Sequence, residues 1–143
     1  MAQSNPNLYQ PLMNQAHLSI GERKYETAIN LYENILERFL PGDLKTQMYL
    51  SKAYYRKGDF STCKKITLNL LAKHPNCVPL KFNLALCLSN LADNIMSSEI
   101  RRAHQTMEAI KYLKQSQKLF VWVQNNFKGQ FKFIRSTDLS KRQ

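Results

Sequence analysis

The sequence Tyr25-x-x-Ala28-x-x-x-Tyr32 returns 35 residues later as Phe60-x-x-Cys63-x-x-x-Thr67. In both copies an aromatic residue is followed, at helical spacing, by a small residue and then by a further packing position. A repeat of about 34 residues indicates a helix–turn–helix unit that cannot bury its apolar face alone and stacks on copies of itself. The repeat therefore predicts an all-α protein that works through a binding surface rather than a catalytic pocket.

Three units of this kind can be aligned, and their pattern resembles that of the tetratricopeptide repeat. The first helices carry the small residues Ala16, Ser51 and Ala85, which let paired helices approach closely. The second helices carry small residues at the matching places, while larger residues fill the space between the pairs. The residues expected in the structural core of the repeats are Ala16, Ala28, Tyr32, Leu50, Tyr54, Cys63, Leu84, Ala85, Ala109 and Leu113.

We expect an α-solenoid of about three helix pairs, with units at about 8–40, 43–75 and 77–128. The third unit is interrupted, because the pattern Ala109-x-x-x-Leu113 comes later than the period requires. The extra residues predict an insertion near 93–105. Residues 1–7 are expected to be a flexible N-terminus, and residues 129–143 a C-terminal segment that can begin a further helix.

Turn and capping residues predict where the helices begin and end. Pro11 suits the first turn of a helix that runs to about residue 20. Asp43 and Asp59 are expected N-caps, since their carboxylates can accept from unpaired backbone N–H groups. Gly58 is expected to end the third helix, and Pro79 to lie in the first turn of the fifth.

The chain has a formal net charge of +11, and the charge is unevenly placed. Residues 1–44 hold 3 Lys/Arg and 5 Asp/Glu, whereas residues 45–143 hold 18 Lys/Arg and 5 Asp/Glu. A basic body can attract nucleic acid or acidic protein segments, and it can equally be a solvated helical surface. A basic helical nucleic-acid-binding protein is therefore kept as an alternative, with direct nucleic-acid binding left open.

No motif for catalysis or metal binding stands out in the sequence. The three cysteines form no C-x-x-C pair, and His17, His74 and His104 lack metal-ligand spacing. There is no Gly-rich phosphate loop and no Gly-flanked serine elbow. We therefore expect no enzyme activity, no catalytic residue, no metal and no cofactor. The sequence also lacks a run of about 18 apolar residues, so no membrane span is expected.

Three stretches resemble the large tetratricopeptide scaffold subunit of the RNA polymerase II-associated factor (PAF) complex. They are Tyr25-x-x-Ala28-Ile29-x-x-Tyr32-Glu33-Asn34, Tyr49-Leu50-x-x-Ala53-Tyr54-x-x-x-Gly58 and Phe82-Asn83-Leu84-Ala85-Leu86-x-Leu88-x-x-Leu91-Ala92. An insertion and a long helix ending near Phe120 follow the third stretch, and this interruption is the most specific feature. The resemblance covers roughly residues 8–135.

This resemblance implies a nuclear, non-enzymatic scaffold that acts in RNA polymerase II transcription elongation and cotranscriptional histone modification. It implies other protein subunits of the polymerase-associated complex as partners. The family protein is several times longer, so this chain is expected to be a fragment or a short relative. A generic cytosolic tetratricopeptide adaptor for acidic peptides, with a cytoplasmic location, is a further alternative.

Residues of the first helices that face away from their partner helices are expected to line a partner-binding groove. Their mixture of cationic and apolar side chains suits a segment with acidic residues. Chaperone-binding tetratricopeptide proteins hold a terminal carboxylate in a polar clamp, but Tyr49 and Pro79 stand here at places where that clamp needs polar side chains. The candidate groove residues are Met13, His17, Lys45, Met48, Lys52, Tyr55, Arg56, Phe82, Leu86 and Ser89.

Overall fold

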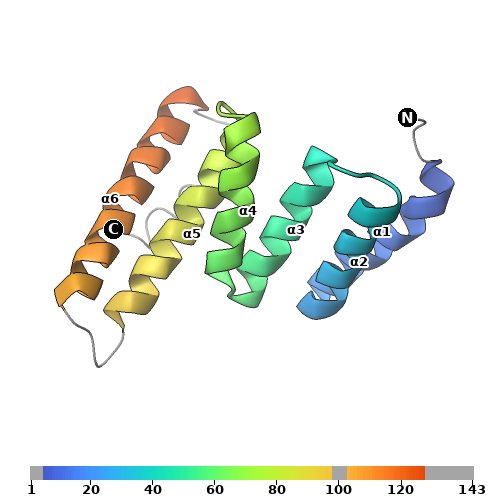
Figure 1. Ribbon diagram of the computed structural model, residues 1–143, viewed down its shortest axis with the longest axis horizontal. Helices are drawn as coiled ribbons and strands as arrows, with labels where there is room; N and C mark the ends of the chain where they lie inside the picture. The colour runs from blue at the N-terminus through green and yellow to red at the C-terminus, as the bar shows by residue number, and fades with distance from the viewer. Residues whose placement is uncertain (1–4, 98–102, 128–143) are drawn as a thin grey trace. The chain divides into compact units, whose positions relative to one another are not determined.

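The computed structural model describes residues 5–97 and 103–127, and within these ranges the fold is all-α with no strand. The chain divides into an N-terminal unit, residues 1–70, and a C-terminal unit, residues 71–143. Within each unit, helices that are adjacent in the sequence pack against each other, as the tetratricopeptide pattern predicts (Figure 1). The helices are α1 (Pro6–Gly21), α2 (Tyr25–Arg38), α3 (Leu44–Lys57), α4 (Phe60–Lys73), α5 (Val78–Met96) and α6 (Ala103–Asn126).

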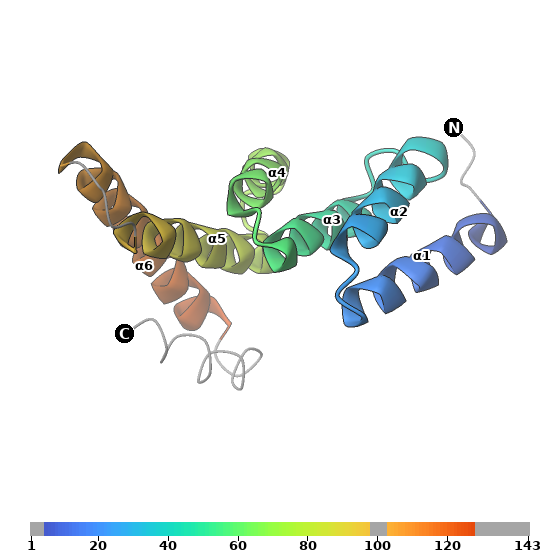
Figure 2. The same ribbon diagram turned by 90° about the horizontal axis from the view of Figure 1, so that it is seen from below.

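The N-terminal unit is held together by small residues at its helix contacts and by larger side chains around them. Ala16, Ala28 and Ala53 have no exposed surface, so α1, α2 and α3 approach one another closely. Tyr32 and Ile35 of α2 fill the same core cluster and are at most 1% exposed. Figure 2 shows α1 and α2 side by side along their length.

Helices α3 and α4 are joined by a buried polar cluster at the position of the repeat's small residues. The Ser51 hydroxyl lies 2.9 Å from the Thr67 hydroxyl and 3.3 Å from the Cys63 thiol. Thr67 also donates to the Cys63 carbonyl one turn earlier, at 2.7 Å. All three side chains are fully buried, so these hydrogen bonds satisfy groups that would otherwise be costly to bury.

The C-terminal unit is built on the contact between α5 and α6 (Figure 1). Ala85, which has no exposed surface, leaves room for Phe120 of α6, and the Phe82 ring meets Phe120 edge to face. The Ser116 hydroxyl donates to the Ala85 carbonyl across the contact at 2.8 Å. Lys81 of α5 places its ammonium 3.9 Å from the centre of the Trp122 ring.

The predicted helix ends are confirmed at four places. Asp43 accepts from the Thr46 backbone N–H at 2.9 Å, and Asp59 accepts from that of Thr62 at 3.1 Å. Gly58 follows α3 in the left-handed region with φ of 96°. Pro79 lies in the first turn of α5, as predicted.

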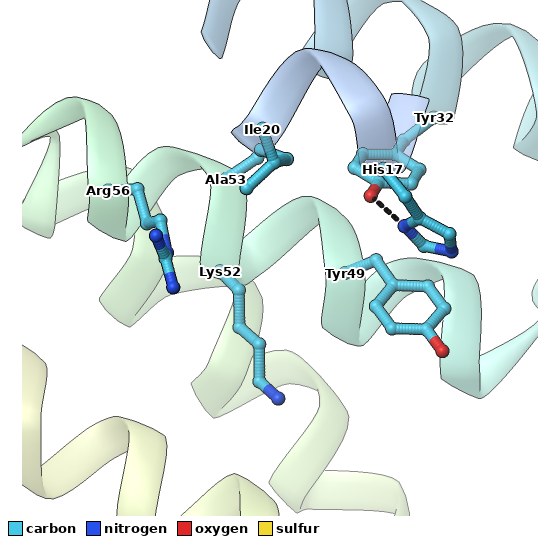
Figure 3. Close-up of a pocket in the computed structure, with 7 residues that line it drawn as sticks. All are labelled: His17, Ile20, Tyr32, Tyr49, Lys52, Ala53 and Arg56. Atoms are coloured by element: carbon cyan, nitrogen blue, oxygen red, sulfur yellow. Dashed lines mark hydrogen bonds between the residues drawn. The ribbon is translucent and has the colours of Figure 1, made fainter. Parts of the chain in front are cut away.

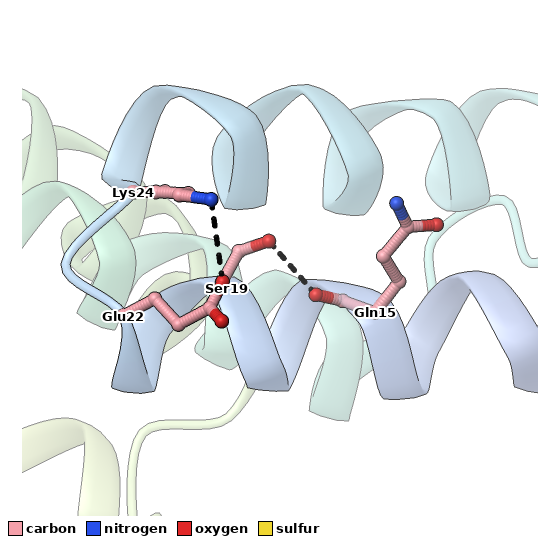
Figure 4. Close-up of polar contacts among 4 residues, drawn as sticks. All are labelled: Gln15, Ser19, Glu22 and Lys24. Atoms are coloured by element: carbon pink, nitrogen blue, oxygen red, sulfur yellow. Dashed lines mark hydrogen bonds and ion pairs between the residues drawn. The ribbon is translucent and has the colours of Figure 1, made fainter.

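The turn between α1 and α2 differs from a simple glycine end (Figure 4). Helix α1 ends at Gly21, but the left-handed residue is Arg23, with φ of 62°. Ser19 donates to the Gln15 carbonyl at 2.9 Å, and the Lys24 ammonium lies 3.5 Å from the Glu22 carboxylate. Ser19 is nearly buried, so the bond to its own helix satisfies the hydroxyl.

One predicted boundary is wrong. Helix α1 begins at Pro6 rather than near Pro11, because the Asn5 side chain accepts from the Asn7 N–H at 2.9 Å and caps it. Residues 6 and 7 therefore belong to the helix. The insertion predicted near 93–105 remains a prediction. Helix α5 continues to Met96 and α6 begins at Ala103, so both ends of this insertion are helical. Residues 98–102 of the predicted insertion lie outside the described residues, as do residues 1–4 and the predicted segment 129–143.

For one residue, Leu113, the predicted place in the core is wrong. Leu113 is 37% exposed, whereas Ala109 and Phe120 on the same helix are buried. The buried stripe of α6 runs through Ala109, Ser116, Phe120 and Val123, and Leu113 lies at its edge. Tyr54 is half-buried, and the other predicted core residues are buried.

Candidate functional site

The N-terminal unit contains a hollow of about 270 Å³ on one side of α3 (Figure 3). Helix α1 contributes two side chains, α2 one and α3 the remaining four. We call this the α1–α3 hollow. Its lining residues are His17, Ile20, Tyr32, Tyr49, Lys52, Ala53 and Arg56.

The sequence of α3 explains why cations reach this hollow. Leu50 and Ala53 are buried in the helix packing. Tyr49, Lys52 and Arg56 follow at spacings of three and four, so they share the neighbouring face. Lys52 and Arg56 are exposed, and neither forms an ion pair among the described residues.

An aromatic group forms the opposite wall. The His17 Nδ1 atom lies 2.6 Å from the Tyr32 hydroxyl in a hydrogen bond. The His17 ring meets the Tyr49 ring edge to face with 4.6 Å between centres, and Tyr49 stacks on Tyr32 at 5.8 Å. In Figure 3, His17, Tyr32 and Tyr49 gather on one side, while Lys52 and Arg56 lie on the other.

Both members of the hydrogen-bonded pair are neutral at pH 7, although the His17 side chain is exposed and Tyr32 is buried. Partial burial, with a smaller effect from the Lys45 charge, lowers the pKa of His17 below its usual 6.5. Burial, with a smaller effect from Tyr49, raises the pKa of Tyr32 to about 12. The positive charge at the hollow therefore comes from Lys52 and Arg56 near neutrality, and His17 serves as a polar ring.

The chain is similar to a known protein along most of its length. It is 26% identical over 125 residues to the RNA polymerase-associated protein CTR9 of Caenorhabditis elegans. The chain is a distant relative of CTR9. The matched stretch is 87% of this chain but only 11% of CTR9, so the chain spans a small part of that protein's length. No family model matches the sequence.

The relation to CTR9 does not assign the hollow. Of the ten predicted groove residues, His17, Lys52 and Arg56 line it. Lys45 is exposed on the same helix as the two cations and acts on the His17 pKa. Met48 is half-buried, and the Tyr55 ring contacts Phe60 with 5.3 Å between centres.

The remaining predicted groove residues serve the helix packing. Met13 and Ser89 are buried, so their assignment to a groove is wrong. Phe82 and Leu86 pack against the cluster of Ala85 and Phe120 in the C-terminal unit. An outward position in the repeat pattern did not predict exposure here, because α5 is apolar on several sides.

Four lining residues were missing from the predicted groove: Ile20, Tyr32, Tyr49 and Ala53. Tyr32 was expected in the core, and it is buried there. Its hydroxyl also forms a hydrogen bond with His17, which lines the hollow. Tyr49 could have been found from sequence, because it lies three residues before Lys52 on the same helical face.

The structure offers no metal centre in its described ranges. Across residues 5–97 and 103–127, no three His, Cys, Asp or Glu side chains gather closely enough to hold a metal ion. Every helix within those ranges is too short or too polar to cross a membrane.

Proposed function

We propose that this chain is a non-enzymatic scaffold that binds protein subunits of an RNA polymerase-associated complex. The observation that carries the proposal is the similarity to CTR9, a protein named for its association with RNA polymerase, along 87% of the chain. The proposal extends to a nuclear role in RNA polymerase II transcription elongation and in cotranscriptional histone modification, which the sequence resemblance to the PAF-complex scaffold implies.

The architecture supports a binding role. The helices bury small and apolar residues against one another, and exposed aliphatic side chains, among them Leu18, Leu68 and Met107, remain on the outer surfaces. The α1–α3 hollow presents two cations and an aromatic wall, and such a surface suits recognition of another protein. We propose that the chain carries three tetratricopeptide units, at about 8–40, 43–75 and 77–128.

Affinity capture from nuclear extract tests the proposal. The tagged 143-residue chain, shown to be helical by circular dichroism, is expected to retain polymerase-associated subunits that mass spectrometry identifies. The tag alone is the control for background. Capture is repeated after nuclease treatment, because a basic chain can recover proteins through bridging nucleic acid.

Two results would contradict the scaffold role. A folded chain that retains no polymerase-associated subunit speaks against it directly. Capture that disappears after nuclease treatment speaks for nucleic-acid binding instead.

A further inference from the structure

We infer that the α1–α3 hollow is a subsite for one acidic side chain of a partner protein segment. Lys52 and Arg56 hold its carboxylate, and an apolar side chain next to it in the same segment lies against Ile20 and Tyr49. The inference rests on the proposed function, because it names the chemistry by which the scaffold recognises a partner.

The hollow carries positive charge that no acidic lining residue balances. Its seven lining residues include two cations and no aspartate or glutamate. Lys52 and Arg56 are one helical turn apart on α3 and have no ion-pair partner among the described residues. The guanidinium offers two parallel N–H donors to a carboxylate, and the ammonium adds a third contact to it.

By contrast, Lys57, the cation that follows Arg56 on α3, is already matched. Its ammonium pairs with the Glu26 carboxylate of α2, and this hydrogen bond raises the pKa of Lys57. The fold thus uses one α3 cation to join two helices and leaves two others facing the hollow.

The shape and lining of the hollow suit a short piece of a partner chain. In Figure 3 the side chains of Ile20 and Ala53 lie together in the middle of the view, and the rings of His17 and Tyr49 lie to their right. These groups are apolar or aromatic and can exclude water from around a bound side chain, which strengthens a charged contact beside them. The volume of about 270 Å³ suits a small part of a segment rather than a whole folded surface.

The lining also favours a protein segment over nucleic acid. A nucleic-acid strand is held by a run of cations that follows successive phosphates. This hollow has only two cations, and they lie beside the apolar side chains of Ile20 and Ala53. A segment in which an acidic residue stands beside an apolar one can bind the two cations and the apolar side chains of the hollow together.

Peptide titration of the full 143-residue chain tests the subsite. The probe is a short acetylated and amidated peptide with a single glutamate beside a phenylalanine, and its twin carries glutamine in place of glutamate. Capping removes both terminal charges. Nuclear magnetic resonance titration should shift the signals of Tyr49 and Arg56, and the glutamine twin should bind about tenfold more weakly.

A charge-matched pair of variants separates the subsite from the general basic charge. Lys52→Gln with Arg56→Gln should lower affinity for the glutamate peptide by about tenfold or more. Lys65→Gln with Lys73→Gln removes the same charge from exposed positions of α4 and should leave the affinity unchanged within about twofold. Circular dichroism of both variants checks that helicity is kept.

Several outcomes would overturn the subsite. They are equal binding of the two peptides, an equal loss in the α4 variant, and tighter binding of a phosphoserine peptide than of the glutamate peptide. A single-stranded oligonucleotide that binds through Lys52 and Arg56, while the glutamate peptide does not bind, overturns it as well.

Capture from nuclear extract distinguishes failure of the subsite from failure of the proposed function. If the Lys52→Gln, Arg56→Gln variant retains the same polymerase-associated subunits in the same amounts, the subsite is wrong and the scaffold role stands. If the wild-type chain binds the glutamate peptide but retains none of these subunits, the scaffold role is wrong and the subsite stands.

Discussion

His17 and Tyr32 share a hydrogen bond, and their pKa values move away from neutrality in opposite directions. The common cause is burial, which disfavours the charged form of each group. The pair is therefore stable as a neutral unit between the two pKa values. Below that range, a protonated His17 is repelled by the Lys45 charge on α3.

This pair predicts a dependence of stability on pH. As pH falls, the unfolded chain takes up a proton at His17 near its usual pKa of 6.5, while the folded chain does so only at lower pH. The free energy of unfolding should therefore fall from about pH 6.5 downward until the lowered pKa is passed. Urea unfolding of the wild type and of His17→Gln across this range measures it.

The His17→Gln variant should show a shallower fall over the same range. Since both proteins keep every other titratable group, the difference between their curves isolates His17. Parallel curves would mean that His17 titrates alike in the folded and unfolded chains.

Two leucines of the C-terminal unit should differ sharply in their contribution to stability. Leu84 on α5 is 7% exposed and Leu113 on α6 is 37% exposed, although the repeat pattern places both in the core. Leu84→Ala should lower the free energy of unfolding by roughly 2–5 kcal/mol. Leu113→Ala should cost less than about 1 kcal/mol, because little buried surface is lost. Chemical denaturation of both variants compares them, and equal losses would restore Leu113 to the core.

At the scale of a helix, the ends are specified by single residues. Asp43 accepts from both the backbone N–H and the hydroxyl of Thr46, at 2.9 and 2.6 Å. Asp43→Ala should therefore lower stability by about 1 kcal/mol. Asp43→Asn keeps an acceptor oxygen at the cap and should cost less. Thermal unfolding monitored by circular dichroism measures both, and identical melting temperatures for the two variants would contradict a capping role.

The two glycines that end α1 and α3 are expected to respond in opposite ways to alanine. Gly58 has φ of 96°, where an L-residue is strained, so Gly58→Ala should cost about 1–2 kcal/mol. Gly21 lies at the end of α1 without a positive φ and has open space around its Cα. Gly21→Ala should be neutral or stabilise by about 0.4–1 kcal/mol through the unfolded chain. Equilibrium unfolding in urea decides, and equal effects at both sites would refute the backbone argument.

Helix existence and capping could be predicted from the sequence, because both depend on local patterns. The limits of α2 and the caps Asp43 and Asp59 follow from neighbouring residues alone. The start of α1 was misplaced because Asn5-Pro6 and Pro11 are both reasonable start signals, and the Asn5 hydrogen bond decides between them. The burial of Ser89 and the exposure of Leu113 depend on how α5 and α6 pack, and helical spacing within one element does not determine that.

The hollow was only partly predictable for a similar reason. The cations Lys52 and Arg56 could be placed by their position in the repeat. The aromatic wall needs α1, α2 and α3 together, since His17, Tyr32 and Tyr49 come from three helices. A repeat pattern read one unit at a time does not show such a meeting of side chains.

At the scale of the whole molecule, the net charge of +11 acts at longer range than the hollow. The chain should be retained on a heparin column and released by salt, because polyanions respond to overall charge. Lys52→Gln with Arg56→Gln should lower the eluting salt concentration only slightly, by the same amount as Lys65→Gln with Lys73→Gln. A much larger decrease for the first variant would show that the hollow itself recognises the polyanion.

The burial of Cys63 and Cys87 in the helix contacts leaves Cys77, which is half-buried before α5, as the one accessible thiol among the three. Thiolate chemistry needs contact with the reagent, so maleimide dyes or spin labels should react at Cys77 first. The natural sequence therefore already carries an attachment point for spectroscopy, next to the first turn of α5 and with no engineered cysteine.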